Sequence, residues 1–230
     1  MGKKVLVILT SHGKLGATDK PTGWYLPEFA HPYDVFVKAG LELTVASPLG
    51  GHAPLDPASV EASKDDASSQ AFLEQQTALW EKTAPLKDFV GRADQFDAVF
   101  VPGGHGPMFD LATDATSQAV LAEFADKGKV VAAVCHGPAA LVGVRLPSTG
   151  ELLVRGRRVT GFTNAEEDQV GLSNVMPFLL ETRLNEASGG KFVKSAEPWG
   201  VKVVEDGRLI TGQNPASAKA LGEALVKALS

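Results

Sequence analysis

The sequence predicts an α/β fold, a mostly parallel sheet with helices on both faces, from three observations. Short continuous apolar runs are bounded by glycine, proline or polar residues, which is typical of strands buried on both faces. Helical patterns lie between these runs, and alternation of strands with helices favours a parallel sheet. The 230 residues are 44% hydrophobic and 21% charged, as in globular proteins.

The first half of the chain predicts three strands, at residues 4–9, 43–46 and 98–101. Pro27 to Ala39 has apolar residues at helical spacing and is followed by Gly40, which predicts a helix, and Pro32 predicts a kink or a later start. Residues 51–95 are polar, with a helical pattern near 72–80. They predict a cap or insertion on one domain that spans residues 1–230.

The second half predicts a helix over 117–127 and a fourth strand over 130–134. Residues 152–162 and 201–212 each have the pattern of a hairpin, with Arg155-Gly156 and Asp206-Gly207 as turns. Asn214 and Pro215 are typical of a helix start, and this last helix is expected to end near Leu229.

Charge and cysteine content narrow the possible partners. The 22 basic and 27 acidic residues give a net charge of −5, which disfavours nucleic-acid binding. A single cysteine excludes an intramolecular disulfide and fits a reducing compartment. The apolar stretches are too short to span a membrane, and neither a secretory signal nor an N-myristoylation pattern is present. We therefore expect a cytoplasmic protein without membrane or nucleic-acid partners.

Cys135 has the sequence context of a nucleophile elbow. It ends the apolar strand 130–134, small residues lie two positions away on either side, and Gly137-Pro138 opens a short helix expected over 139–144. The N-terminus of that helix would favour the thiolate, and the backbone N–H of His136 would be the first oxyanion donor. The alternative is that Cys135 is a small buried hydrophobic residue.

A second glycine cluster, residues 103–106, follows the strand 98–101 and contains Gly104 and His105. In an open parallel sheet it would lie at the same carboxyl edge as Cys135. The N–H of Gly104 could then be the second oxyanion donor, whereas the alternative is a plain glycine turn. The cluster lacks the pattern of a phosphate-binding loop.

A base and an orienting acid can also be identified. His136 is the only histidine at or beyond the cysteine, and Glu166, Glu167 and Asp168 follow an expected strand. One of these carboxylates could orient His136 and complete a Cys, His, Glu triad. The alternative is three solvated acids in the first turn of a helix.

Glu28 lies early in the first predicted helix, near the same sheet edge. A neighbouring thiolate would raise its pKa and make it a proton shuttle, although an exposed glutamate is the alternative. Trp24 and Tyr25 lie close to it and could line the site or simply pack. No metal-ligand spacing occurs, so no metal is expected.

Four of these segments, residues 28–32, 103–106, 133–138 and 212–217, resemble the ThiJ/PfpI superfamily. Within it they resemble specifically the heat-shock-type branch, the glutathione-independent glyoxalases often called glyoxalase III. The resemblance implies a flavodoxin-like three-layer sandwich and a homodimer. It also implies that Cys135 is the nucleophile, His136 its base and Glu28 the carboxylate at the thiol. The triad acid falls at Glu167, one residue from Glu166.

The resemblance implies a cofactor-independent lyase of the glyoxalase III (D-lactate dehydratase) type. Its substrate would be a small dicarbonyl, methylglyoxal, converted to lactate through a Cys135 hemithioacetal with Gly104, His105 and Trp24 around the substrate. Two alternatives are a cysteine-dependent amidase, peptidase or deglycase, and a stress-related holdase chaperone or thiol sensor. Related glutamine amidotransferases need a histidine far downstream of the cysteine, and this chain has none.

Overall fold

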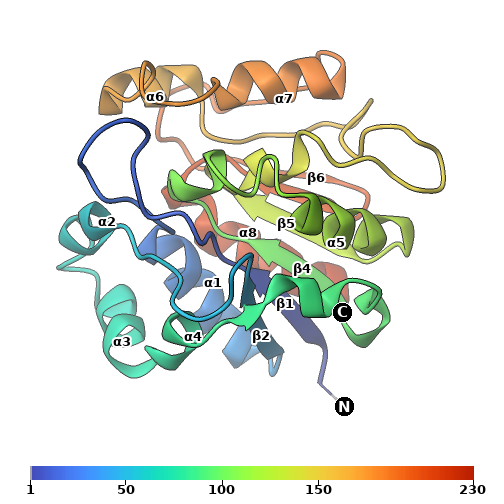
Figure 1. Ribbon diagram of the computed structural model, residues 1–230, viewed down its shortest axis with the longest axis horizontal. Coiled ribbons are helices and arrows are strands. Elements are labelled where there is room, and N and C mark those ends of the chain that lie inside the picture. The colour runs from blue at the N-terminus through green and yellow to red at the C-terminus, as the bar shows by residue number, and fades with distance from the viewer. Residues whose placement is uncertain (1) are drawn as a thin grey trace.

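The computed structural model describes residues 2–230 and contains one seven-stranded sheet (Figure 1). The strand order is β3-β2-β1-β4-β5-β7-β6, and neighbouring strands are parallel except β6 with β7. The predicted α/β class is therefore confirmed. The strands are β1 (Lys4–Ile8), β2 (Glu42–Ser47), β3 (Ala84–Pro85), β4 (Ala98–Val101), β5 (Val130–Val134), β6 (Val203–Asp206) and β7 (Leu209–Gly212).

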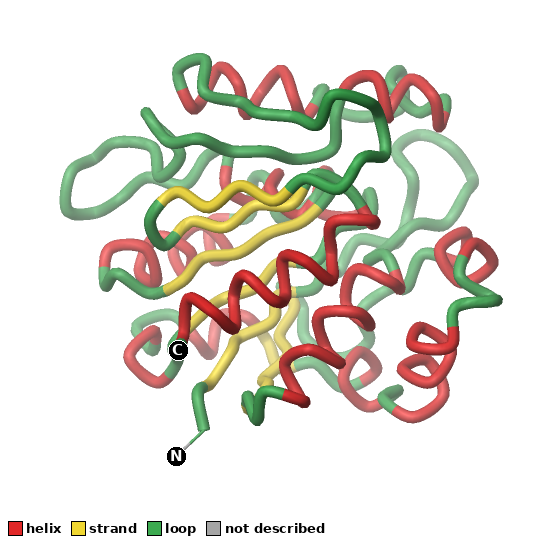
Figure 2. The backbone as a smooth tube through the Cα atoms, turned by 180° about the vertical axis from the view of Figure 1, so that it is seen from behind, coloured by secondary structure: helices red, strands yellow, loops and turns green. Residues whose placement is uncertain are grey.

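Helices cover both faces of the sheet. Figure 2 shows α8 and α1 in front of the strands, and Figure 1, from the opposite side, shows α5 in front of them. The α-helices are α1 (Leu26–Lys38), α2 (Pro57–Ala62), α3 (Ala67–Gln75), α4 (Ala78–Glu81), α5 (Ala115–Asp126), α6 (Asn164–Val170), α7 (Leu180–Ser188) and α8 (Ala218–Leu229). Short 3₁₀ turns cover Leu86–Phe89, Ala93–Gln95, Gly106–Met108, Gly137–Leu141 and Pro215–Ser217.

The four predicted strands are present as β1, β2, β4 and β5, whereas the two-residue edge strand β3 carries no apolar run and was not predicted. Helix α1 begins at Leu26 and continues past Pro32. Pro32 packs against α8, where a Cβ on Gly222 would lie 3.0 Å from the Pro32 Cα. Burial of α1 against α8 therefore outweighs the cost of the proline.

Of the two predicted hairpins, only that over 201–212 is present, as β6 and β7. The prediction for 152–162 is wrong, because its two arms pair elsewhere. Leu152 bridges to Arg145, and Val159 bridges to Phe192. The turn at Arg155-Gly156 does form, but each arm is buried against a different partner, and tertiary packing decides the pairing.

Residues 51–95 contain α2 to α4, β3 and two 3₁₀ turns, and they pack on α1 through an aromatic cluster. The Trp24 ring lies at its centre and contacts Phe29 of α1, Phe72 of α3 and Trp80 of α4, with ring centroids 5.9, 6.2 and 5.9 Å away. The indole N–H of Trp24 donates to the carbonyl of Ala53. Within residues 2–230, no helix is long and apolar enough to cross a membrane.

The strand register places three loops at one edge of the sheet. Val101 at the end of β4 pairs with Ala133 of β5, and Val134 pairs with Gly212 at the end of β7. The residues that follow these strands therefore lie side by side beyond the carboxyl ends, where open α/β sheets place their sites.

Truncation of Trp24 should destabilise the protein. We expect Trp24→Ala to lower the free energy of unfolding by about 3–5 kcal/mol, the range for a large buried aromatic side chain, because Trp24 is fully buried. Urea denaturation followed by circular dichroism measures the change. Leu49→Ala, at a side chain that is 80% exposed, is the control, and equal stability of the two variants would contradict this prediction.

Candidate active site

Cys135 lies in a sharp turn after β5 and adopts a left-handed backbone conformation, with φ of 60°. Among residues 2–230, only Trp199 shares this conformation without being glycine. The Cys135 N–H donates to Gly212, and the Cys135 carbonyl accepts from the Phe162 N–H. A Cβ on Gly137 would lie 2.2 Å from the Val101 carbonyl oxygen, so only glycine fits there. Such strain is found at functional sites.

The segment after this turn differs from the predicted helix. The structure has a five-residue 3₁₀ turn, Gly137–Leu141, in place of a helix over 139–144. Its dipole is much smaller than that of a long helix, because few peptide units are aligned. Stabilisation of a Cys135 thiolate by a helix N-terminus is therefore weaker than a helix over 139–144 would have provided.

The carboxyl group of Glu28 is fully buried beside the Cys135 thiol. The Gly103 N–H donates to Glu28 Oε2 over 2.7 Å. Glu28 Oε1 has no nitrogen or oxygen partner among residues 2–230, and the thiol is the remaining hydrogen-bonding neighbour of this carboxyl group. A buried carboxyl oxygen in this position can exchange a proton with the sulfur.

Burial raises the pKa of Glu28 from 4.5 to about 8, against the opposing hydrogen bonds from Cys135 and Gly103. Burial and the neighbouring Glu28 also raise the pKa of the Cys135 thiol well above its usual value. Since both values are raised, the pair holds at least one proton at neutral pH. The pKa of Glu28 is thus raised, as predicted, but the largest cause is burial and not the neighbouring thiolate.

The imidazole of His136 lies between the thiol and Glu167. Its Nδ1 is 3.4 Å from Cys135 Sγ, and its Nε2 is 2.5 Å from Glu167 Oε2. Burial, followed by the nearby His105, lowers the pKa of His136 to about 4, so the ring is neutral at pH 7. Burial alone would raise the pKa of Glu167, but hydrogen bonds with His105 and His136 lower it to about 2.

These charge states assign the protons on His136. An ionised Glu167 can only accept hydrogen bonds, so Nε2 of His136 carries the proton and donates to it. The Nδ1 lone pair of the neutral ring then faces the thiol, where it can accept the S–H proton.

His105 lies beside His136 and shares the same carboxylate. Its Nε2 is 2.9 Å from Glu167 Oε1, and the two imidazole centroids are 4.2 Å apart. The side chain expected near the substrate oxygen is thus engaged with Glu167. The ligand atoms of His105, His136 and Glu167 lie within 4.8 Å of one another, as a metal site would require, but their mutual hydrogen bonds fit an imidazole–carboxylate network.

Two backbone N–H groups border the site without an acceptor. Neither the N–H of Gly104 nor that of His136 donates to a group within residues 2–230. Gly104 has φ of +90°, and a Cβ there would lie 2.2 Å from the Gly23 carbonyl oxygen. Free N–H groups beside a nucleophile can bind a developing oxyanion.

The two adjacent glutamates have different partners. Glu167 bonds to the two imidazoles, whereas Glu166 forms a capping box with Thr163 at the start of α6. The pattern Thr163-x-x-Glu166 is visible in the sequence and is typical of such a cap. This pattern alone would have indicated that Glu166 caps the helix and that Glu167 is the residue that contacts His136.

Trp24, expected near the substrate, is fully buried in the aromatic cluster beneath residues 51–95, so its side chain is a packing residue. Its neighbour Tyr25 is half-buried, and burial followed by the charges of Glu28 and Cys135 raises its pKa to about 12.

Phe162 and Trp199 also lie beside the site, and the sequence did not predict them. The Phe162 ring centroid lies 4.4 Å from that of His136, and no sequence pattern indicated this contact.

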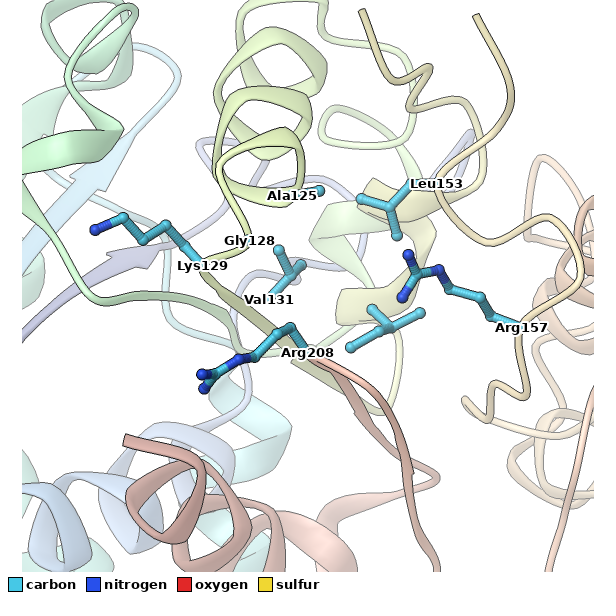
Figure 3. Close-up of a pocket in the computed structure, with 8 residues that line it drawn as sticks. Ala125, Gly128, Lys129, Val131, Leu153, Arg157 and Arg208 are labelled. Carbon is cyan, nitrogen blue, oxygen red and sulfur yellow. The ribbon is translucent and has the colours of Figure 1, made fainter. Parts of the chain in front are cut away.

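A separate cavity of about 130 Å³ lies at the opposite edge of the sheet, where β5 and β7 begin (Figure 3). In Figure 3 the Arg157 side chain points into this cavity, while the charged ends of Lys129 and Arg208 point away. None of the residues around Cys135 lines it. Cys135 itself is 3% exposed.

Comparisons with known proteins agree with this architecture. The model of the DJ-1/PfpI family matches residues 23–228. Glyoxalase 3 of Candida albicans is 34% identical over 233 residues, covering 98% of each chain. The glutathione-independent glyoxalase hsp3102 of Schizosaccharomyces pombe is 34% identical over 238 residues, covering 99% of this chain and 98% of that one.

A solved structure of glyoxalase III from Candida albicans superposes with a TM-score of 0.90 at 32% identity. The match covers 98% of this chain and 97% of that one. At this similarity the shared feature is the whole fold, including the carboxyl edge that carries Cys135.

The buried Glu28 should make stability fall as pH rises. The folded state keeps the Glu28 proton up to a pKa of about 8, whereas an unfolded carboxyl group loses it near 4.5. Between these values the folded state binds more protons, so its stability decreases with pH. We expect the free energy of unfolding of Glu28→Gln, relative to wild type, to increase by about 3 kcal/mol from pH 5.5 to pH 8.

Urea denaturation at the two pH values measures this difference. Glu61→Gln, at an exposed side chain paired with Lys64, is the matched control. A Glu28→Gln difference that is the same at both pH values would show that Glu28 is ionised throughout.

Proposed function

Since the chain belongs to the DJ-1/PfpI family, we propose that it is a glutathione-independent glyoxalase that converts methylglyoxal to lactate. The observation that carries this proposal is the position of the Cys135 thiol. It lies between a neutral imidazole lone pair on His136 and the buried carboxyl group of Glu28, whose pKa is raised to about 8. Relatives of full length named as glyoxalases support the same reaction.

The first step is addition of Cys135 to the aldehyde carbon of methylglyoxal. The S–H proton passes to His136 Nδ1 as the S–C bond forms. The aldehyde oxygen gains the negative charge, which the N–H groups of Gly104 and His136 stabilise. Protonated Glu28 then gives its proton to this oxygen, which leaves a hemithioacetal and a Glu28 carboxylate.

The second step moves a hydrogen from C1 to C2. The Glu28 carboxylate removes the C1 proton, the electron pair forms the C1–C2 double bond, and the ketone oxygen takes the proton held by His136. The enediol then collapses: C2 receives a proton from Glu28, the C1 hydroxyl returns its proton to the Glu28 carboxylate, and C1 becomes the carbonyl of a lactoyl thioester. C1 is oxidised and C2 is reduced within one molecule, so no external redox partner is needed.

Hydrolysis completes the cycle. His136, oriented by Glu167, removes a proton from water as the oxygen attacks the thioester carbonyl. The C–S bond then breaks, and His136 gives this proton to the sulfur, which releases lactic acid and restores the thiol. The sum is methylglyoxal plus water giving lactate and a proton. A pKa of Glu28 of about 8 suits a group that must donate and accept a proton in one turnover.

The substrate class proposed is therefore a small 2-oxoaldehyde. The proposal also includes a homodimer, which the family resemblance supports, and a cytoplasmic location, with which the single free cysteine is consistent.

Methylglyoxal consumption and lactate formation without glutathione test the reaction. We expect Cys135→Ala to lose all turnover, and Glu28→Gln and His136→Asn to lose about 10²- to 10⁴-fold in kcat, as for removal of a general acid or base. His52→Asn, at a histidine paired with Glu81 on the surface, is the matched control. Activity in Cys135→Ala equal to wild type would exclude the proposed mechanism.

The oxyanion contact has its own test. Gly104→Ala should lower kcat about 10²- to 10³-fold, as for loss of one oxyanion donor, because its Cβ would push the loop from the Gly23 carbonyl. Gly51→Ala is the control, since it also has a positive φ but has open space around it. Equal kcat in the two variants would remove Gly104 from the mechanism.

A further inference from the structure

The segment Ser195–Gly200 passes outside the thiol site and is held in a strained conformation. Trp199 within it has φ of +65°, a conformation that costs an L-residue free energy. Its backbone N–H donates to Glu166 Oε1 over 2.8 Å, and its indole N–H donates to Gln169 Oε1 over 2.5 Å. At the other end of the segment, the Ser195 N–H donates to Gln213 Oε1. Side chains of α6 and of the loop after β7 therefore fix this segment.

Glu166 is the centre of this network. Its carboxylate is fully buried and has no lysine, arginine or histidine within 4.0 Å among residues 2–230. Hydrogen bonds alone stabilise its charge, and it accepts five, from Thr163 N, Thr163 Oγ1, Trp199 N, Gln213 Nε2 and Asn214 Nδ2. Two of the donors belong to the 212–217 segment, which the proposed reaction does not use.

Trp199 in turn covers one wall of the site. Its ring packs edge-on against Phe162, with centroids 5.5 Å apart. Phe162 lies against His136, with centroids 4.4 Å apart. Exposure falls along this row, from 42% for Trp199 to 4% for Phe162 and 1% for His136. Trp199 is thus the solvent-facing member of an aromatic stack that ends on the imidazole.

We propose that Glu166 is a positioning residue that, with Gln213 and Asn214, holds Trp199 over Phe162, and that this aromatic stack shields from solvent the side of the His136 imidazole that packs on Phe162, while Nδ1 faces the thiol. The proposal rests on the proposed function only in taking His136 as the base. The adjacent glutamates then have complementary roles. Glu167 orients His136 directly, and Glu166 holds the Trp199–Phe162 packing beside it.

The consequence is a measurable change in the charge state of His136. Burial is the first cause of its low pKa of about 4. The titratable groups that face it are Cys135, His105, Glu166 and Glu167, and none of them is altered when Trp199 is truncated. Water that enters beside the ring stabilises the imidazolium, so the pKa should move toward 6.5.

Nitrogen NMR of the histidine rings measures this pKa directly, with His136→Asn to assign the signal among five histidines. We expect Trp199→Ala to raise the His136 pKa by about one unit, the usual scale of environmental shifts, and Trp199→Phe to restore most of the wild-type value. Val201→Ala, at an exposed apolar residue two positions further along the chain, should change nothing. An unchanged pKa in Trp199→Ala overturns the proposal.

Glu166→Gln separates positioning from simple electrostatics, because the two effects have opposite signs. The negative charge of Glu166 raises the pKa of His136, so loss of that charge alone would lower it. Loosening of Trp199 would raise it. The proposal requires a rise, and a fall overturns it. Trp199→Ala changes a half-exposed side chain and keeps the test decisive if Glu166→Gln does not fold.

Activity adds an independent readout. In the pH profile of kcat/KM for methylglyoxal, the apparent pKa of the acid limb should rise in Trp199→Ala by the same amount as the His136 pKa measured by NMR. A wild-type protein without glyoxalase activity would refute the proposed function and leave the NMR result as the test of the aromatic stack. An active enzyme with an unshifted limb and an unshifted NMR pKa would refute only the stack.

Discussion

The removal of water from around Cys135 is the constraint on which the rest of the site depends. Four titratable side chains, Glu28, Cys135, His136 and Glu167, are almost fully buried there. An isolated buried charge costs several kcal/mol, so such groups become neutral or acquire hydrogen-bond partners. Glu28, Cys135 and His136 are held toward their neutral forms, while Glu167 remains ionised because two imidazoles donate to it. These charge states determine which groups of the site can donate a proton and which can accept one.

Close approach of backbone segments is what makes the burial possible. A Cβ on Gly103 would lie 2.6 Å from Glu28 Oε2 and 2.7 Å from the His136 nitrogen, so the glycine loop after β4 and the turn after β5 can meet only without a side chain there. The parallel register of β4 and β5 brings these two loops to the same level. Sheet geometry, glycine position and thiol environment are therefore parts of one arrangement.

The sequence predicted those features that depend on local pattern. Residues 98–101 and 130–134 are continuous apolar runs, and their strands end where expected. Features decided by tertiary partners were predicted less well. The two arms of 152–162 have strand-like sequences, but they pair with Arg145 and Phe192 and not with each other. Trp24, an aromatic residue expected to line the substrate pocket, instead packs beneath residues 51–95. Neither choice of partner is encoded in a local pattern.

The proposed base is the residue next to the nucleophile. In this chain the imidazole nearest the thiol belongs to the next residue, and His136 Nδ1 still lies 3.4 Å from Cys135 Sγ because the left-handed turn at Cys135 directs both side chains to one side. The same residue then supplies the imidazole and one free backbone N–H. Proton removal from the thiol and binding of the oxyanion are thereby fixed relative to each other by a single peptide unit. A displacement of that unit would disturb both functions at once. Its Cys135 carbonyl accepts a hydrogen bond from the Phe162 N–H, and the Cys135 N–H of the preceding peptide unit donates to the Gly212 carbonyl.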